Sequence, residues 1–490
     1  MGEHILVIDE GTTSTRALLF AADGRCLGSA QHPLTQHYPA PGYVEHDAEE
    51  IWQLTLACAR DMVALAGGAS AIAGIGITNQ RETIVFWDRR TGVPLAPAIV
   101  WQDRRTADMC DQLKANGQEE VVQAKTGLLL DPYFSGSKIG WALAHWPQLK
   151  EAGDNLAVGT IESYLVYRLT GGAHVTDASN AARTALMSLG SGGWDDGLLD
   201  SFGVPRALLP EIVDCAGAIG TTLPDLFGGA IAITGMAGDQ QAATIGQGCF
   251  APGQTKATFG TGAFVLTNTG TTPPRSRNRL LSTVLMQLGG ERTYALEGSV
   301  FVAGSLIKWL RDGLGLIASA DETEALARSV PDSGGVCVVP ALSGLGAPHW
   351  SPHARGLIDG MSFATQRAHV VRAALEAMAH QTHDLMTAFA ADGADWSELR
   401  IDGGMVANNW LAQDLSDMLD LPVERPRFIE TTALGAAMLA GVGAGLFGSL
   451  ADTAVMRGAV ERFHPDMASA ARQTRLMGWK AALDRTLLGL

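Results

Sequence analysis

The chain has 490 residues, more than the roughly 250–300 that one hydrophobic core serves, so its length predicts two domains. Apolar residues make up 47% of the sequence and charged residues 18%, a balance that is typical of globular proteins and argues against disorder. The net charge of -16 repels the phosphate backbone of nucleic acid, which excludes it as an expected partner. Any anionic ligand must therefore be held by a local arrangement of donors.

The six cysteines form no C-x-x-C pair and have no histidine at zinc spacing, so we expect reduced thiols in a reducing compartment. The N-terminus has no basic region followed by a long apolar stretch, which argues against secretion and favours a cytoplasmic location. Segment 431–451 has no charge, but it is mostly alanine and glycine. That composition predicts a tightly packed buried helix and a glycine-rich turn in preference to membrane insertion.

The first half opens on a strand at 4–9, a polar turn at 11–14 and a second strand at 15–20. Asp23-Gly24 is a hairpin signal before a third strand. A helix is expected from 48 to 65, with Asp47 as its N-cap. Further strands are expected at 73–78 and 84–87, separated by the polar cluster 79–83. The alternation of strands and helices predicts an α/β fold.

The second half repeats this opening. A strand at 254–259, a turn at 260–262 and a strand at 263–267 come first, and a strand at 399–402 runs into Gly403-Gly404 and a helix at 409–419. The duplication predicts two domains, 1–246 and 247–490, joined near the glycine-containing stretch 246–253. A cleft between two such halves is a natural ligand site.

The turn at 11–14 places a glycine and three hydroxyl residues between two strands, so its N–H and O–H groups can surround a phosphate. We expect the hydroxyls of Thr12, Thr13 and Ser14 to bond phosphate oxygens, and Arg16 adds a fixed positive charge. Asp9, at the end of the strand, is a candidate ligand for magnesium. The plain alternative is a β-hairpin with a polar turn.

A second glycine-hydroxyl turn, Gly260-Thr261-Gly262, stands at the matching place in the second half, and two such turns could hold a triphosphate from opposite sides. Neither a Walker A sequence nor the protein-kinase motifs occur. The paired glycines at 403 and 404 would let a flat ring approach the backbone, and Asn408 could bond an adenine or ribose edge. Glycine pairs before helices are common, so this third element is a weak signal alone.

Together, these residues resemble the carbohydrate kinases of the FGGY type, and among them the branch that phosphorylates glycerol. The resemblance covers almost the whole chain. It is carried by the strings 9–16, 43–47, 75–83, 98–106, 131–138, 238–243, 260–264, 344–350 and 402–409. It implies two actin- and hexokinase-like (ribonuclease H-like) ATPase domains, with ATP and the polyol meeting in the cleft between them. It also implies a homo-oligomer, either a dimer or a tetramer.

The resemblance also implies roles for individual residues. Asp239 would accept the proton of the reacting hydroxyl as general base, and ATP with magnesium would be the donor, giving sn-glycerol 3-phosphate and ADP. The polyol site would comprise Arg81, Glu82, Trp101, Tyr133, Asp239, Gln240 and Phe264. The nucleotide site would comprise Thr12, Thr13, Ser14, Arg16, Thr261, Gly304, Lys308, Gly404 and Asn408. The chemistry agrees, because a small triol offers little area and must be recognised through paired polar groups.

The chain departs from the family pattern at four places. Glu10 replaces the usual glutamine and should add a negative charge close to the phosphates, while Glu162 replaces the usual aspartate. Lys308 stands where a nucleotide-contacting glutamine is frequent. The loop 227–231 lacks the arginine that binds fructose 1,6-bisphosphate in regulated relatives, so we expect weak or no inhibition by that sugar phosphate.

Two other functions stay open at this point. One is a kinase of another small polyol or sugar, such as erythritol, a pentulose or dihydroxyacetone, which would share the fold. The other is an actin-like protein that binds nucleotide without transferring phosphate. The set of hydroxyl-binding residues favours glycerol over the first, and Asp239 argues against the second.

Overall fold

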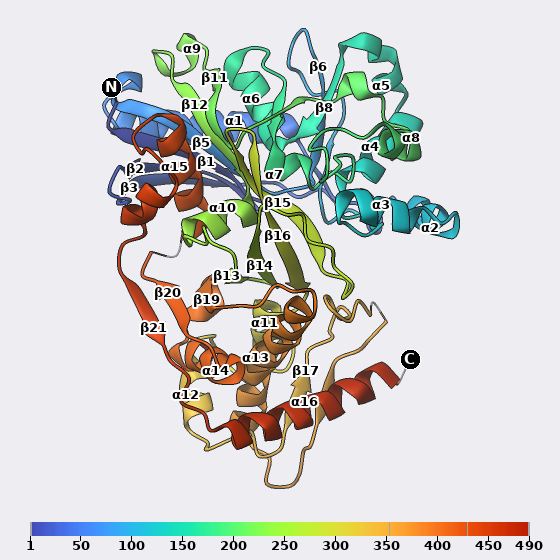
Figure 1. Cartoon of the computed structure of the whole chain (residues 1–490), viewed down its shortest axis with the longest axis vertical. Helices are drawn as coiled ribbons and strands as arrows, with labels where there is room; N and C mark the ends of the chain where they lie inside the picture. Colours follow the sequence, from blue (N-terminus) through green and yellow to red (C-terminus); the bar gives the residue numbers. More distant parts are fainter. Residues whose placement is uncertain (1, 352, 429, 489–490) are drawn as a thin grey trace.

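The computed structural model describes residues 2–351, 353–428 and 430–488 of the chain. Two large sheets dominate it, a six-stranded sheet in the order β11-β12-β5-β1-β2-β3 and a seven-stranded sheet in the order β15-β16-β14-β13-β19-β20-β21 (Figure 1). The first comprises β1 (His4–Glu10), β2 (Ser14–Ala21), β3 (Cys26–Pro33), β5 (Ile72–Asn79), β11 (Ala216–Thr221) and β12 (Ala232–Gly238). The second comprises β13 (Gln254–Phe259), β14 (Ala263–Gly270), β15 (Leu281–Leu288), β16 (Glu291–Val300), β19 (Glu398–Asp402), β20 (Val423–Pro426) and β21 (Val460–Phe463).

The two sheets share one pattern of strand pairing. In the first, β1 is antiparallel to β2 and parallel to β5, which is parallel to β12. In the second, β13 is antiparallel to β14 and parallel to β19, which is parallel to β20. The duplication seen in the sequence is therefore confirmed, and each half begins with a strand, a glycine-containing turn and an antiparallel strand.

The helices flank these sheets, and α1 shows how local sequence sets them. It spans Ala48–Leu65, and the Asp47 carboxylate caps it by accepting from the main-chain N–H groups of Glu49 and Glu50, as expected. The other α-helices are α2 (Ala107–Ala115), α3 (Gln118–Thr126), α4 (Ser135–His145), α5 (Pro147–Ala152), α6 (Ile161–Thr170), α7 (Ala178–Ala181), α8 (Asp196–Phe202), α9 (Pro224–Phe227), α10 (Asp239–Gly246), α11 (Gly304–Asp312), α12 (Glu322–Arg328), α13 (Arg367–Ala391), α14 (Asn409–Leu419), α15 (Thr431–Gly443) and α16 (Ser469–Leu488).

The buried helix expected after residue 431 is confirmed as α15, which packs against α10 and against β1, β5 and β12 of the first sheet. The two helices approach closely because they meet at glycines. A Cβ on Gly435 would lie 1.8 Å from the carbonyl oxygen of Ala242, and one on Gly246 would lie 2.0 Å from that of Thr431. Hence a segment from the end of the chain completes the core of the first sheet. Within the described ranges, no helix is long and apolar enough to cross a membrane.

A smaller sheet of four strands extends the first half, in the order β4-β7-β6-β8. Its strands are β4 (Glu45–His46), β6 (Ile84–Asp88), β7 (Ala98–Ile99) and β8 (Leu156–Thr160), and two further pairs are β9 (Val175–Asp177) with β10 (Glu211–Val213) and β17 (Cys337–Val339) with β18 (Leu357–Asp359). The strand expected at 84–87 thus belongs to this separate sheet. Its loops carry Trp101 and Tyr133 toward the end of β5.

Candidate active site

The first glycine turn is held in place by side chains from three other segments. The indole Nε1 of Trp101 donates to the Thr12 hydroxyl at 2.9 Å, and Gln36 Nε2 donates to the Thr12 carbonyl oxygen at 2.7 Å. Gln80 Nε2 donates to the carbonyl of Gly11 at 3.0 Å. Thr13 is exposed, so its hydroxyl is open to a ligand. The turn is therefore fixed from behind while its tip is free.

The acidic residues beside this turn point in opposite directions. Asp9 lies on the face of β1 opposite to Glu10, where it pairs with Arg16, and Arg16 also donates to Glu430 at 2.7 Å. Burial raises the pKa of Asp9, although Arg16 acts against that rise. Glu10 faces the core, where its carboxyl accepts from the hydroxyls of Thr15 at 3.0 Å and Thr55 at 3.4 Å.

The expectation that Glu10 adds negative charge near the phosphates is therefore wrong. Successive residues of a strand point to opposite faces, and the side chain of Asp9, not that of Glu10, lies on the face where the phosphates are expected. Burial also raises the pKa of Glu10 well above its ordinary value, which favours the neutral acid. A neutral carboxyl here is close in shape and hydrogen bonding to a glutamine.

The second turn, at 260–262, is held by main-chain bonds to the start of α11. The N–H of Gly304 donates to the carbonyl of Gly260 at 2.8 Å, and the N–H groups of Ala303 and Ser305 donate to that of Thr261 at 2.9 and 3.1 Å. A Cβ on Gly304 would lie 2.6 Å from the Gly260 oxygen, so only glycine allows this contact. The Thr261 side chain is exposed, as a hydroxyl must be if it is to bind a ligand.

The remaining residues expected at the nucleotide lie on the second half. Gly403 has φ of +94°, and a Cβ there would lie 2.5 Å from the carbonyl oxygen of Phe259, whereas space beside Gly404 is open. The Asn408 oxygen caps α14 by accepting from Leu411 N–H. Lys308 is exposed on α11. The open backbone at Gly404 fits the approach of a flat ring, while Asn408 already has a structural role.

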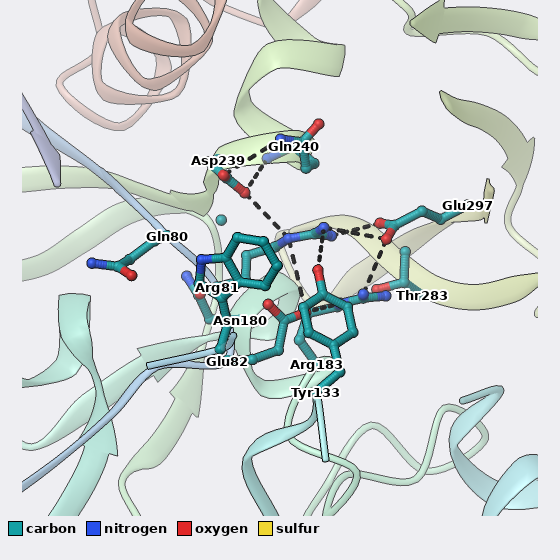
Figure 2. A network of polar contacts seen from close by, with 12 residues as sticks. Gln80, Arg81, Glu82, Tyr133, Asn180, Arg183, Asp239, Gln240, Thr283 and Glu297 are labelled. Carbon is teal, nitrogen blue, oxygen red and sulfur yellow. Dashed lines mark hydrogen bonds and ion pairs between the residues drawn. The ribbon is translucent and has the colours of Figure 1, made fainter. Parts of the chain in front are cut away.

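The two polyol residues expected directly after β5, Arg81 and Glu82, are buried, so they are not an ordinary pair of charged residues at the surface. Arg81 is 3% exposed and Glu82 1% exposed, and Glu82 has an unusual left-handed φ of 62°. Figure 2 shows the Arg81 guanidinium at the centre of a polar network. Its Nε lies 3.2 Å from Asp239 Oδ1, and its Nη2 lies 3.4 Å from the Tyr133 hydroxyl. Arg81, Tyr133 and Asp239 therefore converge on one place.

Two charged residues that the sequence reasoning missed hold this network together. Glu297, on β16, accepts from Arg81 at 2.6 and 3.2 Å and from Arg183 at 3.0 Å. Arg183 in turn donates to Glu82 at 2.6 Å. Burial alone would raise the pKa of Glu297, but Arg183 and Arg81 outweigh it and lower that pKa to about 2. Four buried charges thus bridge the two halves of the chain.

Asp239 begins α10, directly after β12, where its carboxylate is partly exposed. Its Oδ1 accepts from the Gln240 main-chain N–H at 2.7 Å and forms an ion pair with Arg81. Its Oδ2 has one long contact within the part of the chain that the structure describes, 3.4 Å from Gln240 Nε2. Oδ1 is thereby fixed, while Oδ2 is oriented by one weak donor and keeps the capacity to accept a proton from a bound hydroxyl.

Aromatic rings flank the same place. Trp101 and Tyr133 meet edge to face, with ring centroids 5.6 Å apart. Phe264 lies on β14 opposite Ser299 of β16, two residues from Glu297. Because strand residues two apart share a face, Phe264 lies on the same face of the second sheet as Glu297, the face that meets Arg81. The fold thus brings together most of the polyol residues expected from sequence.

The metal expectation rests on a single carboxylate. Among the described residues, no group of three or more histidine, cysteine, aspartate or glutamate side chains is arranged to hold a metal ion. Magnesium typically takes one or two carboxylates together with substrate phosphates and water, and Asp9 beside an open phosphate turn fits that mode. The donor set is compatible with a magnesium ion that arrives with the nucleotide.

Comparison with known proteins identifies the family. The N-terminal domain profile of the FGGY family of carbohydrate kinases matches residues 4–246, and the C-terminal domain profile matches 255–444. The chain belongs to the FGGY family of carbohydrate kinases. Among curated FGGY relatives, a glycerol kinase of Rhodospirillum centenum is 54% identical over 496 residues, covering 100% of this chain and 99% of the relative. A glycerol kinase of Rhodospirillum rubrum is 55% identical over 487 residues, covering 98% of both chains.

A solved FGGY structure agrees. The crystal structure of Plasmodium falciparum glycerol kinase with ADP is 35% identical, covers 99% of both chains and superposes with a TM-score of 0.93. The two-domain kinase fold expected from the sequence is therefore confirmed.

Proposed function

We propose that this FGGY kinase transfers the terminal phosphoryl group of ATP to glycerol, giving sn-glycerol 3-phosphate. The observation that carries the proposal is the convergence of Arg81, Tyr133 and Asp239 around one small place beside the Trp101 ring. A triol with three carbons needs several paired polar groups and one apolar wall, and this set supplies both. Full-length relatives of 52–55% identity that are named glycerol kinase support the choice of substrate.

In the proposed reaction, Arg81 and Tyr133 orient the hydroxyls of glycerol, and Glu82 contributes an acceptor. Asp239 Oδ2 takes the proton of the attacking hydroxyl as the new P–O bond forms and the bond to the ADP oxygen breaks. The turns at 11–14 and 260–262 hold the phosphates through their N–H and hydroxyl groups. Asp9 would hold a magnesium ion that arrives with the nucleotide, and when bound the ion would supply positive charge that offsets charge on the transferred group.

The two turns belong to different halves, so closure of the cleft would bring them onto one triphosphate and exclude water, the competing acceptor. Domains 1–246 and 247–490 are the units that we propose to move, with α15 as the segment that crosses back onto the first sheet. Assembly into dimers or tetramers and a cytoplasmic location stay predictions of the sequence.

A coupled assay of ADP release tests the proposal. The purified protein is given ATP and magnesium with glycerol, erythritol, a pentulose or dihydroxyacetone, and the product is identified by phosphorus NMR. We expect the highest kcat/KM with glycerol and a phosphate monoester at its terminal carbon. A higher kcat/KM for another polyol would mean that this polyol, and not glycerol, is the substrate. ADP release that no polyol stimulates would overturn the proposal.

A further inference from the structure

Lys256 is a buried ammonium at the site with very little compensation. It lies on β13, is 0% exposed, and its Nζ donates to Gln240 Oε1 at 2.6 Å. An ammonium has three N–H donors, yet this neutral amide is its single hydrogen-bond acceptor among the residues that the structure describes. No carboxylate oxygen in the same ranges lies within 4.0 Å of it. Burying such a charge is costly, so its presence calls for a reason.

A second buried lysine has an acceptor for each of its three N–H donors. Lys138, on α4, donates to the carbonyl oxygens of Pro132 at 2.7 Å, Tyr133 at 2.5 Å and Phe134 at 3.3 Å. Its three donors have three acceptors, and it closes the loop that carries Tyr133. Lys256 closes no loop of this kind, so chain stability does not explain it.

The position of Lys256 connects it with the transfer site. Strand pairing sets Lys256, Thr258 and Phe264 on one face of the second sheet, because Thr258 lies opposite Phe264 and Lys256 is two residues before Thr258. The Thr258 hydroxyl is buried and has no partner among the described residues. Burial lowers the pKa of Lys256, while the negative charges of Asp402 and Asp239 act against that fall. The ammonium thus belongs to the face that meets the first half.

The bond to Gln240 has a consequence for the neighbouring base. A lysine ammonium can only donate, so Gln240 must turn its oxygen toward Lys256 and its NH₂ group toward Asp239. With the amide reversed, an oxygen would face Asp239 Oδ2 and repel it. Lys256 therefore excludes one of the two orientations that a glutamine amide could otherwise take.

We propose that Lys256 is a positioning residue of the transfer reaction, which locks the Gln240 amide so that its NH₂ group holds Asp239 in the orientation that receives the substrate proton. This inference rests on the proposed kinase function. Lys256 acts through Gln240 and transfers no proton. The protein keeps this lysine despite the free-energy cost of burying its charge, because the lysine sets the geometry of the base.

The test is Lys256→Met, which keeps the length of the stem and removes the charge. We expect kcat with glycerol to fall by about ten- to a hundredfold, the size of losing one hydrogen bond from a charged donor, with KM for ATP unchanged. We also expect an equal or higher Tm, since an undercompensated buried charge is replaced by an apolar group. Lys138→Met is the matched control and should lower Tm, because it leaves three carbonyl groups without their donor.

A double-mutant cycle separates positioning from a general effect. If Lys256 acts through Gln240, adding Lys256→Met to Gln240→Met costs nothing further, whereas additive losses would overturn the proposal. An unchanged kcat in Lys256→Met would overturn it as well. A parent protein that does not phosphorylate glycerol would instead overturn the proposed function, so the two failures are distinguishable.

Gln240→Glu tests the same geometry with Lys256 in place, should Lys256→Met not fold. The new carboxylate gains Lys256 as its counter-charge, so Tm should not fall. It also places an oxygen where the NH₂ group faced Asp239, so kcat should fall. A variant that keeps the kcat of the parent would contradict the proposal.

Discussion

The two glycine turns occupy matching places in the two halves, yet different groups hold them. Side chains from distant segments supply most of the bonds to the first turn, where Trp101, Gln36 and Gln80 donate to its hydroxyl and carbonyl groups and one main-chain N–H, that of Leu34, donates to Thr13. Main-chain N–H groups at the start of α11 supply three bonds to the second turn, and one hydroxyl, that of Ser305, adds another. The first turn depends mainly on which side chains are present, whereas the second depends mainly on how closely two backbones approach. The same phosphate-binding shape can thus be encoded in two ways.

The second turn should be the more sensitive to a small change. Gly304→Ala places a methyl group 2.6 Å from the Gly260 oxygen, so α11 or the turn must move. Displacement by about 1 Å in a transfer site costs roughly a hundredfold in rate, and we expect a fall of that order in kcat. Steady-state kinetics with saturating glycerol and ATP measure it.

Gly478→Ala is the matched control for this substitution, since a Cβ at Gly478 meets nothing within 4 Å on α16. It should leave kcat unchanged and stabilise the protein by about 0.5–1 kcal/mol, because alanine favours the helix. If Gly304→Ala behaved in the same way, the close approach would have no role in holding the turn.

The first turn should tolerate the loss of one of its contacts. Trp101→Phe keeps an aromatic ring but removes the donor to Thr12, and two other side chains still hold the turn. One hydrogen bond contributes about 1 kcal/mol, so we expect roughly a fivefold lower kcat/KM for ATP.

Trp194→Phe removes a similar indole bond, to the carbonyl of Pro210 at 2.8 Å, far from the site in sequence. It should leave kcat/KM for ATP unchanged. A loss of a hundredfold in Trp101→Phe would mean that this single bond holds the first turn, and the contrast between the turns would disappear.

Glu10→Gln should have the smallest effect on turnover, because the side chain faces the core behind the first turn. Its effect should appear in stability. The raised pKa of Glu10 means that its contribution is fully present below the ordinary value of 4.5 and is lost as the pH rises through the folded-state pKa. Thermal unfolding across pH should show a variant that is more stable than the parent at neutral pH, with the difference vanishing at acidic pH. A difference in stability that stayed the same at every pH would contradict the statement that burial raises the pKa of Glu10.

Sequence reasoning succeeded where the signal was local. Asp47 before an amphipathic stretch predicted the start of α1, and glycine-hydroxyl clusters between apolar runs predicted both turns. Alternation along β1 could also have shown that Glu10 faces away from Asp9, but the sequence alone did not say which face was the core. For that reason, the prediction that the Glu10 side chain adds negative charge near the phosphates was wrong.

The charges that organise the site had no local signal. Arg81 meets Glu297 across 216 positions, and Arg183 meets Glu297 across 114, so only the fold brings them together. One clue was available, since Lys256 is the single charge of β13 and Glu297 is the single charge in the buried part of β16, 294–300. A charge in such a place needs a partner or a ligand, and both residues proved to lie at the site.

The most direct measurement is the turnover of Asp239→Asn. The substitution keeps the shape of the side chain and removes the atom that is proposed to accept the proton. We predict that kcat with glycerol falls by about 10²- to 10⁴-fold, the contribution of a general base, while calorimetry gives an unchanged affinity for ADP and the protein stays folded. Turnover close to that of the parent would contradict the account.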